Sequence, residues 1–214
     1  MKNYVFDVYI DISGKPKSTQ FFGLIAINAE FSYNFEKLFS TEFPGLLKGK
    51  VKGKDLKPNK LIQIMSFFDK NKAYFSSQFI PSTEWEKHKS DFSGAAYFNE
   101  RIYGVAYYRL LEQVAKRKSS IRYNAVLCED NQLGTKKARN YLRRLLSASN
   151  RSVRVSSGLP RDVPQLKFAD FVASAHRRAG YQELKKFSHY KRCPPPLPPR
   201  LLHRVFESRD SKKK

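Results

Sequence analysis

The chain begins with a segment typical of a core strand that carries a carboxylate at its end. Residues 4–14, YVFDVYIDISG, are rich in aromatic and β-branched residues, and Ser13-Gly14-Lys15-Pro16 then breaks the pattern. Asp11 lies at the tip of this predicted strand, where burying a charge is costly unless a partner offsets it. The sequence therefore indicates a metal ion or a catalytic role for Asp11. The alternative is that its side chain caps the turn at Ser13 or Gly14.

The charge of the chain points to a polyanionic partner. Lys and Arg total 41 against 19 Asp and Glu, which gives a formal net charge of +22 spread over the whole sequence. Such an imbalance destabilises a compact state through self-repulsion unless a polyanion or salt offsets it, and nucleic acid is the commonest polyanion. Hydrophobic residues make up 41% of the 214 positions, enough for a folded core. We therefore expect a folded protein whose partner is RNA or DNA.

The cysteines and the apolar segments indicate a soluble, cytoplasmic protein. Cys128 and Cys193 have neither metal-ligand nor redox spacing, so we expect reduced thiols. The longest strongly apolar run, residues 21–29, is too short to span a bilayer. Asp7 and Asp11 interrupt any signal-peptide pattern. We expect no membrane partner, and the oligomeric state stays open.

The apolar periodicity predicts an α/β fold with a mixed central sheet flanked by helices. Strands are expected at residues 4–12, 19–28, 73–80, 121–128 and 151–156, the first two joined as a hairpin. Helices are expected at 28–43, 59–69, 97–118, 134–149 and 164–180, with a Gly- and Lys-rich loop at 44–56 and an irregular segment at 81–96. Because strands alternate with helices in the second half, we expect parallel crossovers in the sheet.

The composition divides the chain into a domain at residues 1–182 and a basic, proline-rich extension at 183–214. Residues 194–200, PPPLPPR, predict a polyproline II segment that resembles the ligands of proline-recognition domains. This segment offers a possible protein partner, or it is a stiff spacer. The amphipathic residues 201–206 that follow could dock on a partner or on the domain itself.

Carboxylates also occur near two other predicted core elements. Glu129 and Asp130 follow the strand at 121–128, and Asp170 lies on the helix at 164–180, where small residues such as Ala169 and Ala173 allow close approach to a sheet. If the strands that end in Asp11 and Asp130 are neighbours, they lie about 4.8 Å apart. Asp170 would then supply a third carboxylate.

Three clustered carboxylates repel one another, and Mg²⁺ or Mn²⁺ relieves this repulsion. Two such ions roughly 4 Å apart can activate a water and stabilise the leaving oxygen in phosphodiester cleavage. Asp11, Asp130 and Asp170 are therefore the candidate catalytic and metal-binding residues, with Glu129 as a further candidate ligand. The alternatives are that Asp130 begins a turn or caps the next helix, and that Asp170 pairs with Arg177 or Lys167.

Basic residues form three groups that could bind phosphates. They lie in the loop at 48–60, on the cationic helix at 134–149 and at the end of the helix at 164–180. The candidate nucleic-acid-binding residues are Lys50, Lys52, Lys54, Lys57, Lys136, Lys137, Arg143, Arg177 and Arg178. Neutralising several phosphates would make binding steeply salt-dependent. A solvated basic surface is the alternative.

Four short motifs resemble the domain of unknown function 3800 family, which belongs to the ribonuclease H-like superfamily. They are Tyr9–Gly14 (YIDISG), Lys52–Leu56 (KGKDL), Leu127–Asp130 (LCED) and Gln165–Asp170 (QLKFAD), within residues 4 to about 180. The resemblance implies a ribonuclease H-like fold whose central strands and final helix carry the acids. It also implies that Asp11, Asp130 and Asp170 are metal ligands.

Two positions depart from the family pattern. The family usually has Glu directly after the first Asp, where this chain has Ile12, and often has Glu just before the Lys-Gly segment, where this chain has Lys50. Asp55 lies a few residues on and is a candidate substitute ligand. The sequence thus supports two hypotheses: a divalent-metal-dependent nuclease acting on RNA or structured DNA, and a ribonuclease H-like protein that binds nucleic acid, for example in a ribonucleoprotein, without turnover.

Overall fold

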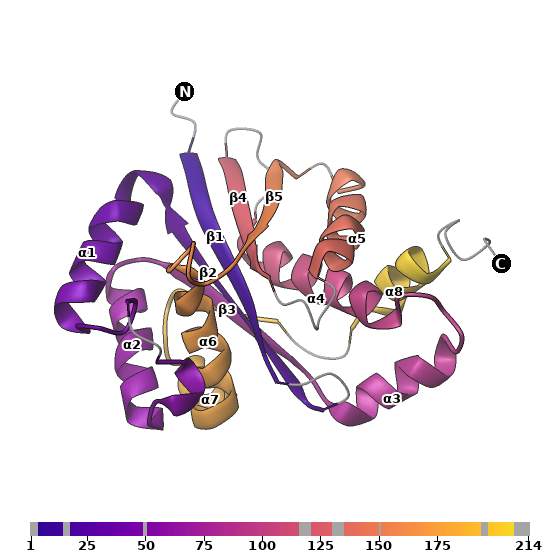
Figure 1. Cartoon of the computed structure of the whole chain (residues 1–214), viewed down its shortest axis with the longest axis horizontal. Helices are drawn as coiled ribbons and strands as arrows, with labels where there is room; N and C mark the ends of the chain where they lie inside the picture. Colours follow the sequence, from indigo (N-terminus) through magenta and orange to yellow (C-terminus); the bar gives the residue numbers. More distant parts are fainter. Residues whose placement is uncertain are drawn as a thin grey trace.

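A six-stranded sheet with the order β5-β4-β1-β2-β3-β6 forms the centre of the protein (Figure 1). This is a computed structural model, and it describes residues 4–14, 18–48, 51–115, 121–129, 135–149, 151–193 and 197–207. The strands are β1 (Tyr4–Ser13), β2 (Gln20–Asn28), β3 (Tyr74–Ile80), β4 (Ile121–Cys128), β5 (Val153–Gly158) and β6 (Tyr190–Arg192). The five strands predicted from the sequence are all present.

The pairing of the strands brings the two acid-tipped elements together. β1 and β2 pair antiparallel, as expected of the predicted hairpin, and place Asp11 opposite Gly23. β1 and β4 are parallel neighbours, with Ile10 opposite Leu127. β5 continues the parallel arrangement beyond β4. The sheet is therefore mixed, as predicted, and the carboxyl ends of β1 and β4 meet at one edge.

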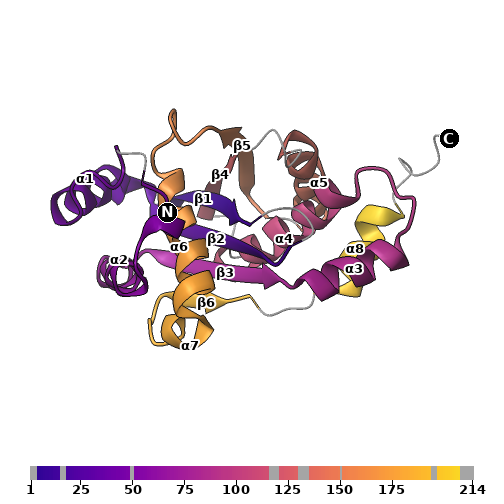
Figure 2. The ribbon, with the colours of Figure 1, turned by 60° about the horizontal axis from the view of Figure 1, so that its bottom comes forward.

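Helices cover both faces of the sheet (Figures 1 and 2). On one side lie α1 (Ser32–Glu42), α2 (Pro58–Lys70), α6 (Leu166–Ala179) and α7 (Tyr181–Leu184). On the other lie α3 (Ser82–Asp91), α4 (Phe98–Val114), α5 (Thr135–Ser147) and α8 (Pro199–Phe206). The single-turn 3₁₀ helices η1 (Ala29–Phe31) and η2 (Gly53–Asp55) lie in the described connections.

The side chains of β1 alternate between the two hydrophobic cores, one on each face of the sheet. Val8 and Ile10 pack toward α4, whereas Tyr9 packs toward α6. The α6 side is dominated by aromatic rings in edge-to-face contact, for example Phe39 and Phe168 with centroids 4.9 Å apart. Each face of the sheet is thereby fixed in register, because a one-residue slip would exchange the two sets of side chains.

The segment at 81–96 was predicted to be irregular, and this prediction is wrong for most of it, because Ser82–Asp91 forms α3. Pro81 precedes the helix with an extended backbone, and Trp85 and His88 are its only buried residues. A helix this polar gives little apolar periodicity, so its stability depends on tertiary packing. Trp85, which packs edge-on against Phe98 with centroids 5.7 Å apart, supplies that packing.

The C-terminal part of the chain contacts the domain. β6 pairs with β3. The apolar face of α8, made by Leu202, Val205 and Phe206, is buried, and Phe206 stacks on Phe92 at 4.1 Å. Of the two docking alternatives for residues 201–206, the structure shows docking on the domain itself. Residues 194–196 lie outside the described residues, and the boundary at 182 stays a prediction.

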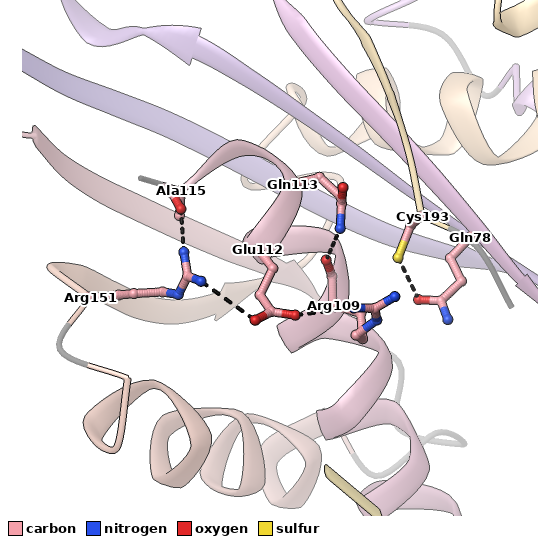
Figure 3. Close-up of polar contacts among 7 residues, drawn as sticks. All are labelled: Gln78, Arg109, Glu112, Gln113, Ala115, Arg151 and Cys193. Carbon is pink, nitrogen blue, oxygen red and sulfur yellow. Dashed lines mark hydrogen bonds and ion pairs between the residues drawn. The ribbon is translucent and has the colours of Figure 1, made fainter. Parts of the chain in front are cut away.

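Arginine contacts attach the start of β5 to the end of α4 (Figure 3). Arg151 donates to the backbone carbonyl of Ala115 and forms an ion pair with Glu112 at 3.5 Å. Glu112 also pairs with Arg109 at 3.4 Å. A cation on the last carbonyls of a helix is favourable because the helix dipole is negative there. This edge of the sheet is therefore tied to the α4 layer.

Neither Cys128 nor Cys193 forms a disulfide bond among the described residues, in keeping with the predicted reduced thiols. The Sγ of Cys193 donates to Oε1 of Gln78 at 3.3 Å (Figure 3). Burial raises the pKa of Cys193 to about 12, which keeps it protonated at neutral pH. Within the described ranges, no helix has the length and apolar character needed to cross a bilayer.

Candidate functional site

The carboxyl ends of β1 and β4 open into a cleft of about 970 Å³. Among the described residues, three carboxylates line it, those of Asp11, Glu129 and Asp170, and they come from β1, the residue after β4, and α6. Five basic side chains line it as well: Lys48, Lys52, Lys54, Arg161 and Lys167. The cleft thus combines acids near the sheet with cations around them.

Asp11 reaches the cleft because of the alternation of β1. It lies on the same face as Tyr9, toward α6, while Ile12 packs against the core on the α4 side. Oδ1 of Asp11 accepts the backbone N–H of Ile12 at 2.7 Å. Ile12 therefore occupies a position whose side chain turns toward the opposite face from Asp11.

Gly23 brings α6 down onto the strand beside Asp11. A Cβ at Gly23 would lie 2.1 Å from the carbonyl oxygen of Ala169 and 2.5 Å from the nitrogen of Ala173, so only glycine fits. The small alanines on the helix side complete this close approach. As a result Asp170, on the same turn of α6, lines the same cleft as Asp11.

Asp170 is held by the Lys-Gly loop and by its own helix. Its Oδ2 accepts the N–H of Gly53 at 2.6 Å, and its Oδ1 accepts the hydroxyl of Ser174 at 3.3 Å. Burial raises the pKa of Asp170; these two hydrogen bonds and the charge of Lys52 oppose that rise, whereas Asp55 adds to it. The net direction is upward, so the ionised form is less favoured here than in water.

Of the two cations considered as partners of Asp170, Lys167 is the one that interacts with it. Burial lowers the pKa of Lys167, and the negative charge of Asp170 acts in the opposite direction. The Nζ of Lys167 also donates to the carbonyl of Leu46 at 3.2 Å. Arg177 is exposed at the end of α6.

The loop at 51–56 closes over α6 and forms one wall of the cleft. A Cβ at Gly53 would lie 2.5 Å from Oγ of Ser174, so the loop approaches the helix where only glycine fits. Asp55, the candidate substitute ligand, accepts the N–H of Lys52 at 3.1 Å across the turn of η2. It is exposed and does not line the cleft.

Glu129 is anchored at the rim by its neighbours on β5. Its N–H donates to the carbonyl of Gly158 at 2.7 Å, which extends the parallel ladder by one residue. Its carboxylate accepts the hydroxyl of Ser157 at 2.6 Å, and Ser157 in turn accepts from Arg139 at 2.7 Å. This chain from α5 through β5 fixes the Glu129 side chain, although it is exposed.

Asp130 and Lys50 lie outside the described residues. Among the residues that are described, no group of three or more His, Cys, Asp or Glu side chains is placed to hold a metal ion. Carboxylate oxygens are the donors that Mg²⁺ and Mn²⁺ prefer. The described carboxylates have the right chemistry for such an ion. Both carboxylate oxygens of Asp170 already accept hydrogen bonds, from Gly53 and Ser174.

The predicted nucleic-acid-binding residues divide into two groups. Lys52 and Lys54 line the cleft, and three more are exposed near it or near the end of α6: Lys57, Arg177 and Arg178. The other group lies on α5 in the opposite layer: Lys136, Lys137 and Arg143. The sequence reasoning did not assign Arg161 or Lys167 to the phosphate-binding set. The only sequence signal for Arg161 is its place in a loop between Pro160 and Pro164.

Comparison with known proteins supports the fold. No protein-family model matches the sequence, and no curated protein matches it. Among solved structures, RNase HII from Archaeoglobus fulgidus, in the structure of its complex with PCNA, is similar with a TM-score of 0.55. The two chains are 14% identical, and the match covers 84% of this chain and 76% of the other. The mixed sheet, its flanking helices and this similarity show that the chain has a ribonuclease H-like fold.

Proposed function

We propose that the protein hydrolyses phosphodiester bonds in RNA or structured DNA with Mg²⁺ or Mn²⁺ as its cofactor. The observation that carries this proposal is that Asp11, Glu129 and Asp170 line one cleft that basic side chains surround. The ribonuclease H-like fold and the similarity to RNase HII support the same class of activity.

The roles follow from the positions of the side chains. Asp11, Asp130 and Asp170 would hold the metal, with Glu129 as a further ligand at the rim. When bound, the metal supplies an activated water and stabilises the leaving oxygen. Lys52, Lys54 and Arg161 would bind phosphates of the strand, and the tight packing at Gly23 would keep Asp170 beside Asp11.

Three further assignments belong to this proposal. Membership in the domain of unknown function 3800 family rests on the four short motifs. A cytoplasmic location rests on the cysteines, neither of which forms a disulfide among the described residues, and on the absence of a spanning helix there. A protein partner for the proline-rich segment rests on its sequence alone.

One observation favours a second function, nucleic-acid binding without turnover. Both oxygens of Asp170 already accept hydrogen bonds, from Gly53 and Ser174. The charges of Lys52 and Lys167 interact with the same carboxylate. A lysine beside a carboxylate can neutralise it without a metal ion. In this function the cleft binds phosphates, and Asp170 stabilises the loop.

A cleavage assay separates the two functions. Purified wild type should cleave a labelled RNA–DNA hybrid or a branched DNA with Mg²⁺ or Mn²⁺, and EDTA should abolish cleavage. Asp11→Asn should lower the rate at least about 100-fold, because several kcal/mol of transition-state stabilisation depend on the metal. Asp7→Asn is the matched control, because Asp7 lies on the same strand and face but does not line the cleft.

Each outcome has a reading. Full activity in Asp11→Asn would overturn the assignment of the site. Tight binding without cleavage by wild type, unchanged in Asp11→Asn, would support the second function. A loss in Asp7→Asn equal to that in Asp11→Asn would show that the cleft is not where the chemistry occurs.

A further inference from the structure

β4 and β5 lie beside the cleft, and α6 leaves most of their face on its side of the sheet uncovered. We call this face of β4 and β5 the open face. On β4 the residues Tyr123, Ala125 and Leu127 are buried in the core on the α4 side. Their neighbours in sequence therefore point to the other face, where Arg122 is exposed and Asn124 is half-buried. Figure 1 shows α6 against β1 and β2, while β4 and β5 extend beyond it.

β5 continues this open face. Val153 and Val155 pack with the core, whereas Arg154 and Ser156 are exposed. The parallel register places Arg154 beside Asn124. Cys128, the last residue of β4 on the same face, lines the cleft. The open face and the cleft therefore lie on the same side of the sheet, with Val126, partly buried beside Val163, between them.

The open face is basic and borders a hollow at the edge of the sheet. This hollow of about 550 Å³ is lined by Asn124, Arg154 and Ser156 from the open face and by Val153, Val155 and Arg143 from the α4 side. Within the described part of the chain, neither Arg122 nor Arg154 forms a salt bridge. The carboxylate of Asp7 borders this face and accepts a hydrogen bond from Asn124 at 3.3 Å.

The edge strand is firmly held, so the hollow is preformed. Arg143 donates to the carbonyl of Val155 at 2.6 Å. Arg151, two residues before β5 begins, binds the end of α4: it donates to the carbonyl of Ala115 and pairs with Glu112, as Figure 3 shows. A preformed basic surface loses little conformational entropy when it binds a rigid polyanion.

We propose that the open face of β4 and β5 binds the phosphate backbone of a double-helical nucleic acid whose scissile region lies in the cleft. This inference rests on the proposed function only for the role of the cleft. A duplex fits better than a single strand because the open-face side chains of β4 and β5 include no aromatic ring: they are Arg122, Asn124, Val126, Cys128, Arg154 and Ser156. Proteins that bind single strands stack the bases on aromatic side chains.

The distance along β4 from the cleft to the basic residues gives the length of nucleic acid that the open face would contact. Cys128 and Asn124 are four residues apart on β4, which is about 13 Å at 3.3 Å per residue. In B-form DNA a strand rises about 3.4 Å per nucleotide. Arg154, beside Asn124, would therefore meet a phosphate about four nucleotides from the cleft, and Arg122 one about six nucleotides away.

The test is a binding titration in EDTA, with fluorescence anisotropy of a labelled 20-bp RNA–DNA hybrid and of a labelled 20-nucleotide single strand. Arg122→Glu/Arg154→Glu should weaken binding of the hybrid at least tenfold at 150 mM salt and lower the salt slope by about 2. The control Lys89→Glu/Arg204→Glu changes the net charge equally on exposed positions of α3 and α8, and it should stay within about threefold of wild type.

A milder pair, Arg122→Gln/Arg154→Gln, removes the same two phosphate contacts without adding negative charge. It should lower the salt slope by a similar amount and weaken hybrid binding less, and it covers the case in which charge reversal impairs folding. Hybrid binding equal to wild type in both pairs, or a loss equal to that of the control, would overturn the proposal. A loss confined to the single strand would overturn the assignment of a duplex. Because EDTA prevents turnover, absence of cleavage in Mg²⁺ would refute the proposed function without changing this result.

Discussion

The backbone N–H of Gly53 donates to Oδ2 of Asp170 at 2.6 Å, across 117 residues of sequence. This bond joins the Lys-Gly loop to α6 and makes the loop a wall of the cleft. It also fixes one oxygen of the carboxylate that the sequence marks as a metal ligand. Asp170 therefore has both a structural role and a proposed catalytic role.

Gly53→Ala should destabilise the protein by about 1–3 kcal/mol, because the new Cβ would lie 2.5 Å from Oγ and 2.7 Å from Cβ of Ser174. Urea unfolding measures this cost. In a Ser174→Gly background the same substitution should cost less, since the two nearest atoms are gone. Equal costs in the two backgrounds would contradict the close packing of loop and helix.

Asp170→Asn should change the pH dependence of stability. Burial raises the pKa of Asp170 in the folded protein, so the stability that its protonated form contributes is present below the unfolded pKa near 3.9. It is lost as the pH rises through the folded pKa. The stability of Asp170→Asn relative to wild type should therefore rise between about pH 4 and neutral pH, as urea unfolding without divalent ions would show.

Mg²⁺ provides the counterpart to that measurement. The cation should stabilise wild type at neutral pH more than Asp170→Asn, because a ligand that binds only the folded state raises its stability. In the measurement without divalent ions, a stability of Asp170→Asn relative to wild type that stays constant or falls as the pH rises would contradict the burial of an ionisable carboxyl at position 170.

Asp69→Asn should destabilise the protein by about 1–2 kcal/mol at neutral pH. Burial raises the pKa of Asp69, but hydrogen bonds from the backbone and ring of His189 and from Ser188 outweigh it and lower the pKa overall. The stabilisation is thus present above the unfolded pKa near 3.9 and is lost as the pH falls through the folded value. Thermal unfolding at pH 7 and pH 3 would measure it, with the exposed Asp91→Asn as the control.

The lysines of the cleft should act through salt-dependent binding. Lys52→Gln and Lys54→Gln should each reduce the slope of log K against log salt by about 0.9 on duplex DNA, because each removes one phosphate contact. Lys87→Gln, at an exposed position on α3, should leave the slope unchanged. Slopes equal to that of wild type in both cleft variants would place the nucleic acid elsewhere.

The sequence predicted the sheet better than the connections, for physical reasons. β1 and β4 are rich in apolar and β-branched residues and lead to acids, so a common cleft for Asp11 and Asp170 was predicted on the condition that the two strands are neighbours, which they are. α3 lacks an apolar stripe and depends on Trp85. The three residues of β6 pair with β3 next to His189, which Asp69 holds, and Ser76 and Ser77 of β3 bond to Lys191 and Tyr190. Contacts of this kind between distant segments leave no local pattern.

Two features of the site also lay beyond the sequence. The hydrogen bond from Gly53 to Asp170 joins segments that no periodicity connects, although the glycine among lysines was visible. The opposite orientations of Asp11 and Ile12 follow from strand alternation, yet their consequence for the cleft depends on which face α6 covers. Asp130, outside the described residues, stays a predicted ligand.

The most direct test of the proposed metal-dependent cleft is a crystal soaked in Mn²⁺ and measured for anomalous scattering. The account predicts a peak within about 2.5 Å of carboxylate oxygens of Asp11 and Asp170, absent in crystals of Asp11→Asn. A cleft with no peak at saturating Mn²⁺, in which Asp170 keeps its bonds to Gly53 and Ser174, would contradict a metal-dependent nuclease.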